Sequence, residues 1–346
     1  MTMEKRTVAV AMSGGVDSSV TAALLQQAGH RVIGITMRLW DGPTTHIEDA
    51  ARVADHLGIP HHVADLEPCF AAEVMGYFVR EYERGRTPNP CARCNKLLKF
   101  GALMDTARSL GAECLATGHY ARVVRGDDGE PHLVAAVNRK KDQSYFLFSL
   151  TRELLRAILF PLGEVQDKQQ VRDLAASLGL PVAAKDDSQD ICFIPGDDYI
   201  AFLQGAGVKS SPGEFVLADG RVVGTHGGIH RYTVGQRRGM GIAWSEPLYV
   251  LGIDAPANRI IVGTEGELYR DGFTIGDCNW IVPAGEEPFP ALCRIRYRHK
   301  PVACTVAPLP GGRAAIRFEK PEKGVTPGQV AVFYDGEEVL GGGWID

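Results

Sequence analysis

Residues 8–19 read Val-Ala-Val-Ala-Met-Ser-Gly-Gly-Val-Asp-Ser-Ser, and this stretch decides the fold. An apolar run typical of a buried strand, Val8–Ala11, passes through two glycines into a helix that we expect over Ser18–Ala28. Glycines let the backbone approach an anion closely, and the N–H groups at a helix N-terminus favour phosphate. We therefore predict a phosphate-binding loop at Ser13–Ser19, with serine hydroxyls as further donors and Asp17 as a Mg²⁺ ligand. The alternative is a plain strand-to-helix turn.

Strand-like and helix-like segments alternate from this loop to Gly118. Such alternation predicts an α/β fold with a parallel sheet that is covered on both faces, and ligands usually bind at the carboxyl ends of its strands. The expected strands are 31–37, 61–66 and 114–117, and the expected helices are 47–57, 70–84 and 95–110.

The pattern changes after Gly118. We expect a hairpin over 121–137 around Gly126–Gly129, and helices over 144–159, 167–178 and 198–203. Beyond about Gly205, short β-rich runs separated by Gly and Pro are typical of small β-barrels. We therefore predict a parallel-sheet domain over 1–204, a small central β-rich domain over 205–268 and a C-terminal β-barrel over 269–346. Expected strands of the last two parts are 215–217, 249–253, 259–262, 293–297, 302–306, 314–318 and 330–333.

The composition and net charge of the chain limit the functions that it can have. No apolar run of the 346 residues is long enough to span a membrane and the N-terminus shows no export signal, so we expect a cytoplasmic protein with reduced thiols. The formal net charge of −5 means that nucleic-acid binding must rest on local basic patches.

Cysteines stand out at two places. Cys91 and Cys94 lie in Pro-Asn-Pro-Cys-Ala-Arg-Cys-Asn, where Cys94 falls near the start of a helix whose dipole, with Arg93 and Lys96, favours a thiolate. A thiolate is the species required of a nucleophile or sulfur carrier. A zinc knuckle is the alternative, although no second pair of ligands has fitting spacing. Cys192 lies between Ile and Phe and, taken alone, fits a core position. The remaining cysteines are expected to be small buried hydrophobes: Cys69, Cys114, Cys278, Cys293 and Cys304.

Basic side chains gather in two C-terminal stretches. The first stretch is rich in glycine. In the second stretch, every other residue is a cation, and on a strand this alternation places four cations on one face. Such a stripe suits phosphate contact, and a solvated strand face is the alternative. The residues are Arg231, Arg237 and Arg238, then Arg294, Arg296, Arg298 and Lys300.

The loop at Ser13–Ser19 resembles the pyrophosphate loop of ATP-pyrophosphatases, which activate a carbonyl oxygen by adenylylation. Over nearly its whole length the chain resembles the bacterial tRNA-specific 2-thiouridylases. That resemblance implies an adenine-nucleotide α-hydrolase-like (PP-loop) domain, and ATP-dependent 2-thiolation of the wobble uridine of tRNA with release of AMP. Besides the loop, the motifs that carry it are Gly85–Pro90, Cys94–Lys96, Thr117–Tyr120, Lys141–Phe146, Asp187–Phe193, His230–Gly239 and Thr326–Gln329.

The resemblance also implies roles for single residues. Cys94 corresponds to the family's nucleophile and Cys192 to the cysteine that carries the persulfide, and the two would form a disulfide during the cycle. Sulfur would come from a donor such as a cysteine desulfurase or a sulfur-relay protein. Residues implied for ATP and Mg²⁺ are Ala11, Met12, Ser13, Gly14, Gly15, Val16, Asp17, Ser18, Met37 and Gly118. Those implied for tRNA and its target base are Asn89, Pro90, Cys91, His119, Lys141, Asp142, Gln143, Arg296, Tyr297 and Gln329.

One position departs from the family pattern. Many relatives place an acid–base Asp where this chain has Cys91. Cys91, Cys94 and Cys192 are therefore an alternative ligand set for a [4Fe–4S] cluster that would carry the sulfide. An amide-forming ATP-pyrophosphatase and a tRNA-binding protein without catalysis are the remaining alternatives.

Overall fold

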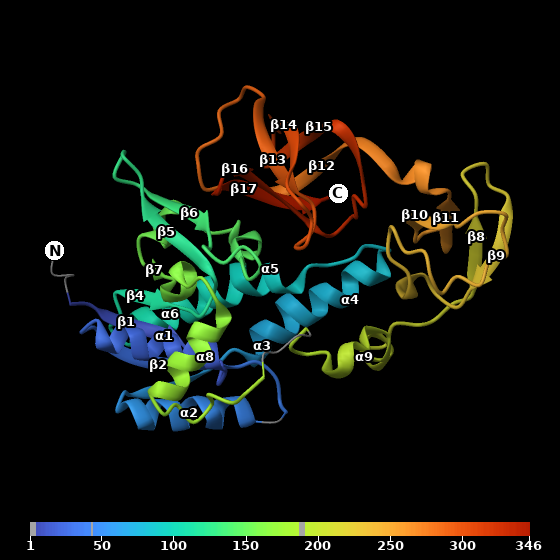
Figure 1. Ribbon diagram of the computed structural model, residues 1–346. Helices are drawn as coiled ribbons and strands as arrows, with labels where there is room; N and C mark the ends of the chain where they lie inside the picture. The colour runs from blue at the N-terminus through green and yellow to red at the C-terminus, as the bar shows by residue number, and fades with distance from the viewer. Residues whose placement is uncertain (1–4, 43, 187–190) are drawn as a thin grey trace.

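The computed structural model describes residues 5–42, 44–186 and 191–346, and Figure 1 shows their arrangement. The first domain is built on a five-stranded, wholly parallel sheet in the order β3-β2-β1-β4-β7. No helix among these residues is long and apolar enough to cross a membrane. The strands are β1 (Thr7–Ala11), β2 (Arg31–Arg38), β3 (His61–Asp65), β4 (Cys114–Ala116) and β7 (Ile158–Leu159).

Helices cover both faces of this sheet. Val8 and Val10 belong to a core shared with α1 (Val16–Gln27), α2 (Thr45–Leu57) and α8 (Lys168–Ser177), whereas Ala9 belongs to the core shared with α6 (Leu103–Ser109). The α/β prediction is thus confirmed, and the strand-to-helix turn at residues 12–15 lies at the carboxyl edge of the sheet.

Two long helical runs connect this domain to the rest of the molecule. In each run a π-helical segment is inserted between α-helical turns. The first run is α3 (Glu67–Phe70), η1 (Ala71–Met75) and α4 (Gly76–Glu83); the second is α5 (Pro90–Cys94), η2 (Asn95–Ala102) and α6. They share an aromatic core with α9 (Tyr199–Gly205), in which the ring of Phe193 packs edge to face against those of Phe70 and Phe78. Because Phe193 adjoins Cys192 and Cys94 lies in the same core, this packing brings the two cysteines toward each other.

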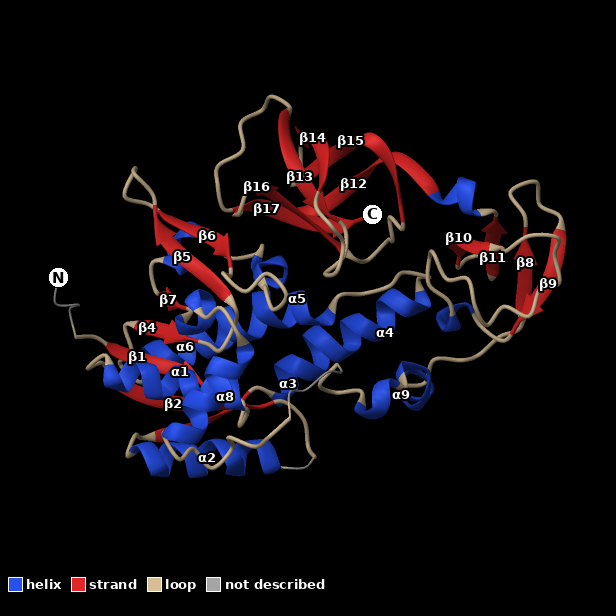
Figure 2. Cartoon of the chain, in the orientation of Figure 1, coloured by secondary structure: helices blue, strands red, loops and turns tan. Residues whose placement is uncertain are grey.

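The central and C-terminal parts are β structures, drawn in red in Figure 2. The central sheet has the order β10-β11-β8-β9, and the strands β12–β17 close into a six-stranded barrel through the β12–β17 pairing. The central strands are β8 (Gly213–Val216), β9 (Val222–His226), β10 (Tyr249–Asp254) and β11 (Arg259–Gly263). The barrel strands are β12 (Tyr269–Trp280), β13 (Phe289–Arg294), β14 (Val302–Leu309), β15 (Arg313–Lys323), β16 (Val330–Asp335) and β17 (Glu338–Ile345).

The hairpin β5 (Ala121–Arg125) and β6 (Pro131–Ala135) extends the barrel sheet, because β17 pairs with β6 at Glu338 and Val134. The barrel therefore rests directly on the parallel-sheet domain (Figure 1). Short helical turns complete the described structure: η3 (Ser144–Leu147), α7 (Arg152–Leu155), η4 (Pro161–Glu164), η5 (Pro195–Asp197), η6 (Ile229–Arg231) and η7 (Glu265–Leu268).

Two predicted elements are wrong. The helix expected over 144–159 is a 3₁₀ turn, a new helix that the Thr151 side chain caps by accepting from the Leu154 N–H (3.2 Å), and the edge strand β7. The strand expected over 293–297 ends at Arg294, since that side chain folds back and donates to the carbonyl of Tyr297. The expected stripe of four cations on one strand face is therefore wrong as well. Strands β9, β12 and β17 were not anticipated.

Candidate active site

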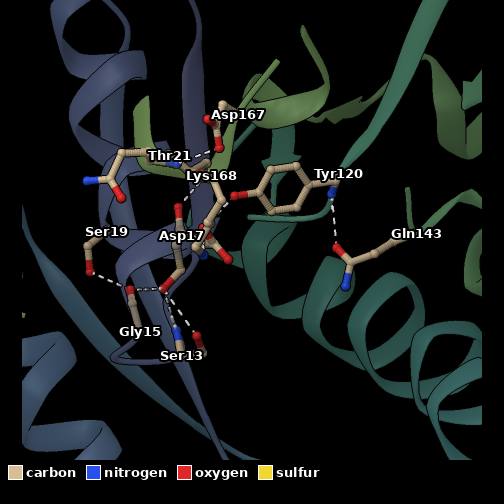
Figure 3. A network of polar contacts seen from close by, with 11 residues as sticks. Ser13, Gly15, Asp17, Ser19, Thr21, Tyr120, Gln143, Asp167 and Lys168 are labelled. Carbon is tan, nitrogen blue, oxygen red and sulfur yellow. Dashed lines mark hydrogen bonds and ion pairs between the residues drawn. The ribbon is translucent and has the colours of Figure 1, made fainter. Parts of the chain in front are cut away.

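The loop between β1 and α1 holds itself in a tight turn. Gly14 has a φ of +67°, and a Cβ atom there would overlap the carbonyl oxygen of His46. The Ser13 N–H donates to Ser18 Oγ (3.0 Å), and the hydroxyls of Ser18 and Ser19 donate to the Gly15 carbonyl (3.1 and 2.8 Å; Figure 3). Two of the three serines expected to bind phosphate thus hold the loop in shape, and the loop lines the cavity at Ser13 and at residues 15–18.

Asp17 is already engaged by a cation. Its Oδ1 accepts from the Lys168 ammonium (2.6 Å) and from the Tyr120 hydroxyl (2.9 Å), as Figure 3 shows. Tyr120 in turn donates its backbone N–H to the side-chain carbonyl of Gln143 (3.0 Å). A Mg²⁺ ion at Asp17 therefore competes with an ammonium group that balances the same charge.

One cavity of about 1430 Å³ joins the loop to the barrel. It runs from the nucleotide loop past Cys192 to the turn that follows β13. Of the residues predicted for ATP, all except Gly14 line it: Ala11, Met12, Ser13, Gly15, Val16, Asp17, Ser18, Met37 and Gly118. Of those predicted for tRNA, the lining includes His119, Lys141, Asp142, Gln143 and Tyr297, whereas Asn89, Pro90, Cys91, Arg296 and Gln329 lie outside it.

The far wall of this cavity is strongly basic despite the net charge of −5. Arg139 on this wall pairs with Glu337. At the loop end of the cavity, Lys185 binds Asp49 (2.5 Å) and the Gly14 carbonyl (3.0 Å). Several further cations on the wall have no carboxylate partner in the described part of the chain: Lys99, Lys140, Arg298 and Lys300. Such a surface attracts a polyanion.

Asp142 has a structural role that sequence did not reveal. Its buried carboxylate accepts from the backbone of Ala136 and Ser144 (3.1 and 3.2 Å), from the Ser144 hydroxyl (3.0 Å) and from Arg294 (3.2 Å). The Arg294 guanidinium lies over the ring of Tyr297 at 6.0 Å. This network fixes the turn at residues 295–301, which brings Tyr297, Arg298 and Lys300 to the cavity.

The segment before Cys91 is held from both sides. The Asn89 side chain caps α5 by accepting from the Ala92 N–H (3.1 Å). The amide of Gln329, on the barrel, donates to the carbonyls of Thr87 (3.0 Å) and Pro88 (3.1 Å). Gln329 therefore places this loop relative to the barrel.

All eight cysteines are free thiols. Cys91 and Cys192 are exposed, whereas Cys94 is 9% exposed. The sulfur atoms themselves are poorly solvated even where the residue is exposed, and this desolvation raises the pKa of Cys94 to about 11 and that of Cys192 to about 12, and it also raises the pKa of Cys91. The prediction of a stabilised Cys94 thiolate is thus wrong for the protein alone.

The two cations expected to lower that pKa point elsewhere. Arg93 pairs with Glu73 and Lys96 with Asp277, both at 2.7 Å. Asp187–Asp190, the first part of the Cys192 motif, lie outside the described residues.

His119 is buried and uncharged. Its Nδ1 lies 2.7 Å from the Thr117 hydroxyl, and its ring contacts Phe100 and Phe160. Burial holds the His119 pKa well below its ordinary value, so the imidazole is neutral at physiological pH.

Sequence reasoning missed several residues of the site. Trp40 and His46 stack with ring centroids 6.1 Å apart and line the nucleotide end of the cavity. Lys168 and Lys185 reach the loop from distant segments, and only tertiary structure brings them there. Lys99 had a local signal, since it lies five residues beyond Cys94 on the same helical run.

Comparisons with known proteins cover the whole chain. Residues 6–196 match the family model described as "tRNA methyl transferase HUP domain", residues 200–264 the "tRNA methyl transferase PRC-barrel domain", and residues 270–345 the "Aminomethyltransferase beta-barrel domain". Three curated relatives carry the name tRNA-specific 2-thiouridylase MnmA. The protein from Trichlorobacter lovleyi is 54% identical, over 98% of this chain and 97% of its own. The relative from Pelobacter propionicus is 53% identical with the same coverage, and that from Geobacter metallireducens is 52% identical over 99% and 97%.

Proposed function

The chain belongs to the tRNA-specific 2-thiouridylase family and is accordingly a tRNA sulfurtransferase, and we propose that it adenylylates the wobble uridine of tRNA before it transfers sulfur from Cys192. One observation carries the proposal: a single cavity joins the nucleotide loop, Cys192 and a basic wall. Methyl transfer, which two of the family-model descriptions mention, needs neither an ATP loop nor a sulfur-bearing thiol.

Adenylylation turns a poor leaving group into a good one. Uridine O2 attacks the α-phosphate of ATP, a P–O bond forms, and pyrophosphate leaves with the electron pair. The loop N–H groups and the start of α1 stabilise the phosphates, because both present positive charge to an anion. ATP enters as its Mg²⁺ complex, and the metal would take Asp17 as its protein ligand in competition with Lys168.

Sulfur transfer then uses two cysteines. The terminal sulfur of a Cys192 persulfide forms a bond to C2, and AMP leaves with the electrons of the C2–O bond. The Cys94 thiolate next attacks the Cys192 sulfur, so the thiocarbonyl is released and a Cys94–Cys192 disulfide remains. A dithiol reductant restores both thiols, and a cysteine desulfurase or sulfur-relay protein supplies the next sulfur.

The three thiols do not fit an iron–sulfur cluster as they stand. Among residues 5–42, 44–186 and 191–346, no group of three His, Cys, Asp or Glu side chains is placed to hold a metal ion. We therefore derive no step through a cluster. The absorbance spectrum of anaerobically purified protein checks this choice: active enzyme without a visible band supports the persulfide route, and a broad band contradicts it.

The tRNA is proposed to lie along the basic wall, with its wobble base unstacked and inserted into the cavity. Tyr297 offers a ring to the flipped base, and the neutral His119 imidazole offers a hydrogen-bonding nitrogen without repelling Lys99. The cytoplasmic location stays a prediction.

The test separates the two half-reactions. We expect Cys192→Ala to retain tRNA-dependent pyrophosphate release and to lose 2-thiouridine, which is measured by mass spectrometry of digested tRNA. Cys69→Ala, in the aromatic core that contains Phe193 and Cys94, is the control and should thiolate normally. Full thiolation by Cys192→Ala would refute the proposal. An amide-forming synthetase would instead keep its activity with ammonia when both Cys94 and Cys192 are replaced.

A further inference from the structure

Lys99 occupies a central place that the mechanism above does not use. It lies on η2, which continues α5 without a break, and it lines the cavity together with Cys192 and His119. A π-helix hydrogen-bonds from residue i to residue i+5, and Lys99 is five residues beyond Cys94 on this run. Its side chain is half-buried and has no carboxylate partner within the described ranges, whereas Arg93 and Lys96 on the same run are both paired.

The charge of Lys99 acts on the three cysteines and on His119, of which Cys192 and His119 line the cavity. It lowers the pKa of Cys91, Cys94 and Cys192 against the larger opposing effect of burial, and it disfavours protonation of His119. Lys99 lines the same cavity as two of these groups, Cys192 and His119. The nucleotide end of the cavity has its own cations, since Lys168 and Lys185 contact the loop there.

The sulfur-transfer chemistry requires a cation at this place. The persulfide attacks as an anion, AMP leaves as an anion, and the Cys94 thiolate is an anion, all in surroundings that disfavour charge. An anion in such surroundings is costly unless an opposite charge is already in position. A preorganised ammonium ion therefore has most effect on this half of the reaction.

We propose that Lys99 is a catalytic residue of the sulfur-transfer half-reaction, in which its ammonium contacts the anionic sulfur passing from Cys192 to C2 of the uridine. The inference rests on the proposed function. Lys99 itself makes and breaks no covalent bond: C–S forms, C2–O breaks with its electrons going to AMP, and the Cys94–Cys192 disulfide balances the release of the sulfur. The ammonium stabilises the charge at each of these steps.

The experiment compares Lys99→Met, Lys99→Arg and Arg108→Met in the full-length protein. Arg108→Met is the matched control, because it removes one positive charge from an exposed position on the same helical run. Two rates are measured for each variant: tRNA-dependent pyrophosphate release and formation of 2-thiouridine. Lys99→Met should lower thiolation about 100-fold, as expected for loss of a group that stabilises transition-state charge, and should leave pyrophosphate release within about twofold. Lys99→Arg should recover about tenfold of that loss.

Three results would overturn the inference. The first is a wild-type rate of thiolation in Lys99→Met. The second is an equal loss of pyrophosphate release and thiolation in Lys99→Met, which indicates a role in binding or folding. The third is a loss of thiolation in Arg108→Met as large as that in Lys99→Met. Failure of the underlying function looks different, because wild-type protein supplied with ATP, tRNA and a persulfide donor would then form no 2-thiouridine at all.

Discussion

Replacing Gly14 by alanine tests the geometry of the nucleotide loop, and Gly58→Ala is its matched control. The two glycines have nearly the same left-handed backbone, with φ of +67° and +64°. A Cβ at Gly58 meets nothing within 4 Å, whereas a Cβ at Gly14 overlaps the His46 carbonyl and comes within 3.0 Å of Asp49 Cβ. Gly58→Ala therefore measures the free-energy cost of the backbone conformation alone, and the difference between the two variants measures the steric cost at Gly14.

The magnitudes follow from these contacts. Each variant loses about 1 kcal/mol because alanine disfavours this backbone conformation. Gly14→Ala must in addition move the loop away from α2, and the free-energy cost of such overpacking is about 1–3 kcal/mol. If the native loop position is the one that binds phosphate, the same energy appears as an ATP affinity about 5- to 100-fold weaker.

The assays are thermal unfolding followed by circular dichroism and ATP binding followed by calorimetry. Gly14→Ala should melt below Gly58→Ala by roughly 3 °C for each kcal/mol of the difference. Gly58→Ala should bind ATP like the wild type. Equal melting temperatures and equal ATP affinities for the two variants would refute the reasoning.

Three further predictions concern polar contacts. Lys168→Met removes the ammonium that competes with Mg²⁺ for Asp17, so tRNA-dependent pyrophosphate release should reach its half-maximal rate at about tenfold lower Mg²⁺ concentration, and an unchanged Mg²⁺ dependence would contradict this assignment. Glu338 raises the His132 pKa through a hydrogen bond of 2.5 Å, so this contact should stabilise the protein below about pH 6.5 and lose its effect as the pH rises through the raised value. The melting difference between wild type and His132→Gln should accordingly be largest in acid, and a pH-independent difference would count against it. Gln329→Leu removes both donors to the loop before Cys91, and we expect about tenfold slower thiolation at unchanged ATP affinity, measured by nucleoside mass spectrometry and calorimetry.

Secondary structure was predicted correctly where it depends on the local sequence alone. The strand, glycine turn and helix over residues 7–27 follow from periodicity and glycine placement, and their predicted bounds are within about two residues of the observed ones. The segment 144–159 misled because residues 145–150 are almost wholly apolar, and such a run does not distinguish a helix from turns buried between a sheet and a barrel. The sequence did not predict β17 because this strand contains Gly341–Gly343, and glycine disfavours a strand. The structure explains Gly342, because the ring of Phe148 lies where a side chain would be, and this contact cannot be read from the local sequence.

The sequence motifs named several residues that line one cavity, and the functional roles assigned to them stay predictions. Motifs placed the nucleotide loop and Cys192, which line one cavity. The helix-dipole argument for Cys94 failed because it considered only neighbours in sequence, whereas the aromatic core around Phe70 and Phe193 decides the pKa. Lys168 is 151 residues from Asp17, and no local pattern joins them.

The shared sheet between the β5–β6 hairpin and the barrel has a consequence for anyone who dissects the protein into fragments. The Tyr145 hydroxyl donates to the carbonyl of Val330 (2.9 Å), and Asn279 donates to the carbonyls of Phe148 and Leu150 (both 2.8 Å). A truncation after residue 204 strips these partners and exposes the edge of β6, which invites aggregation. The natural expression unit is therefore discontinuous in sequence: the nucleotide-binding half and the barrel belong together, and the central domain is an insertion between them.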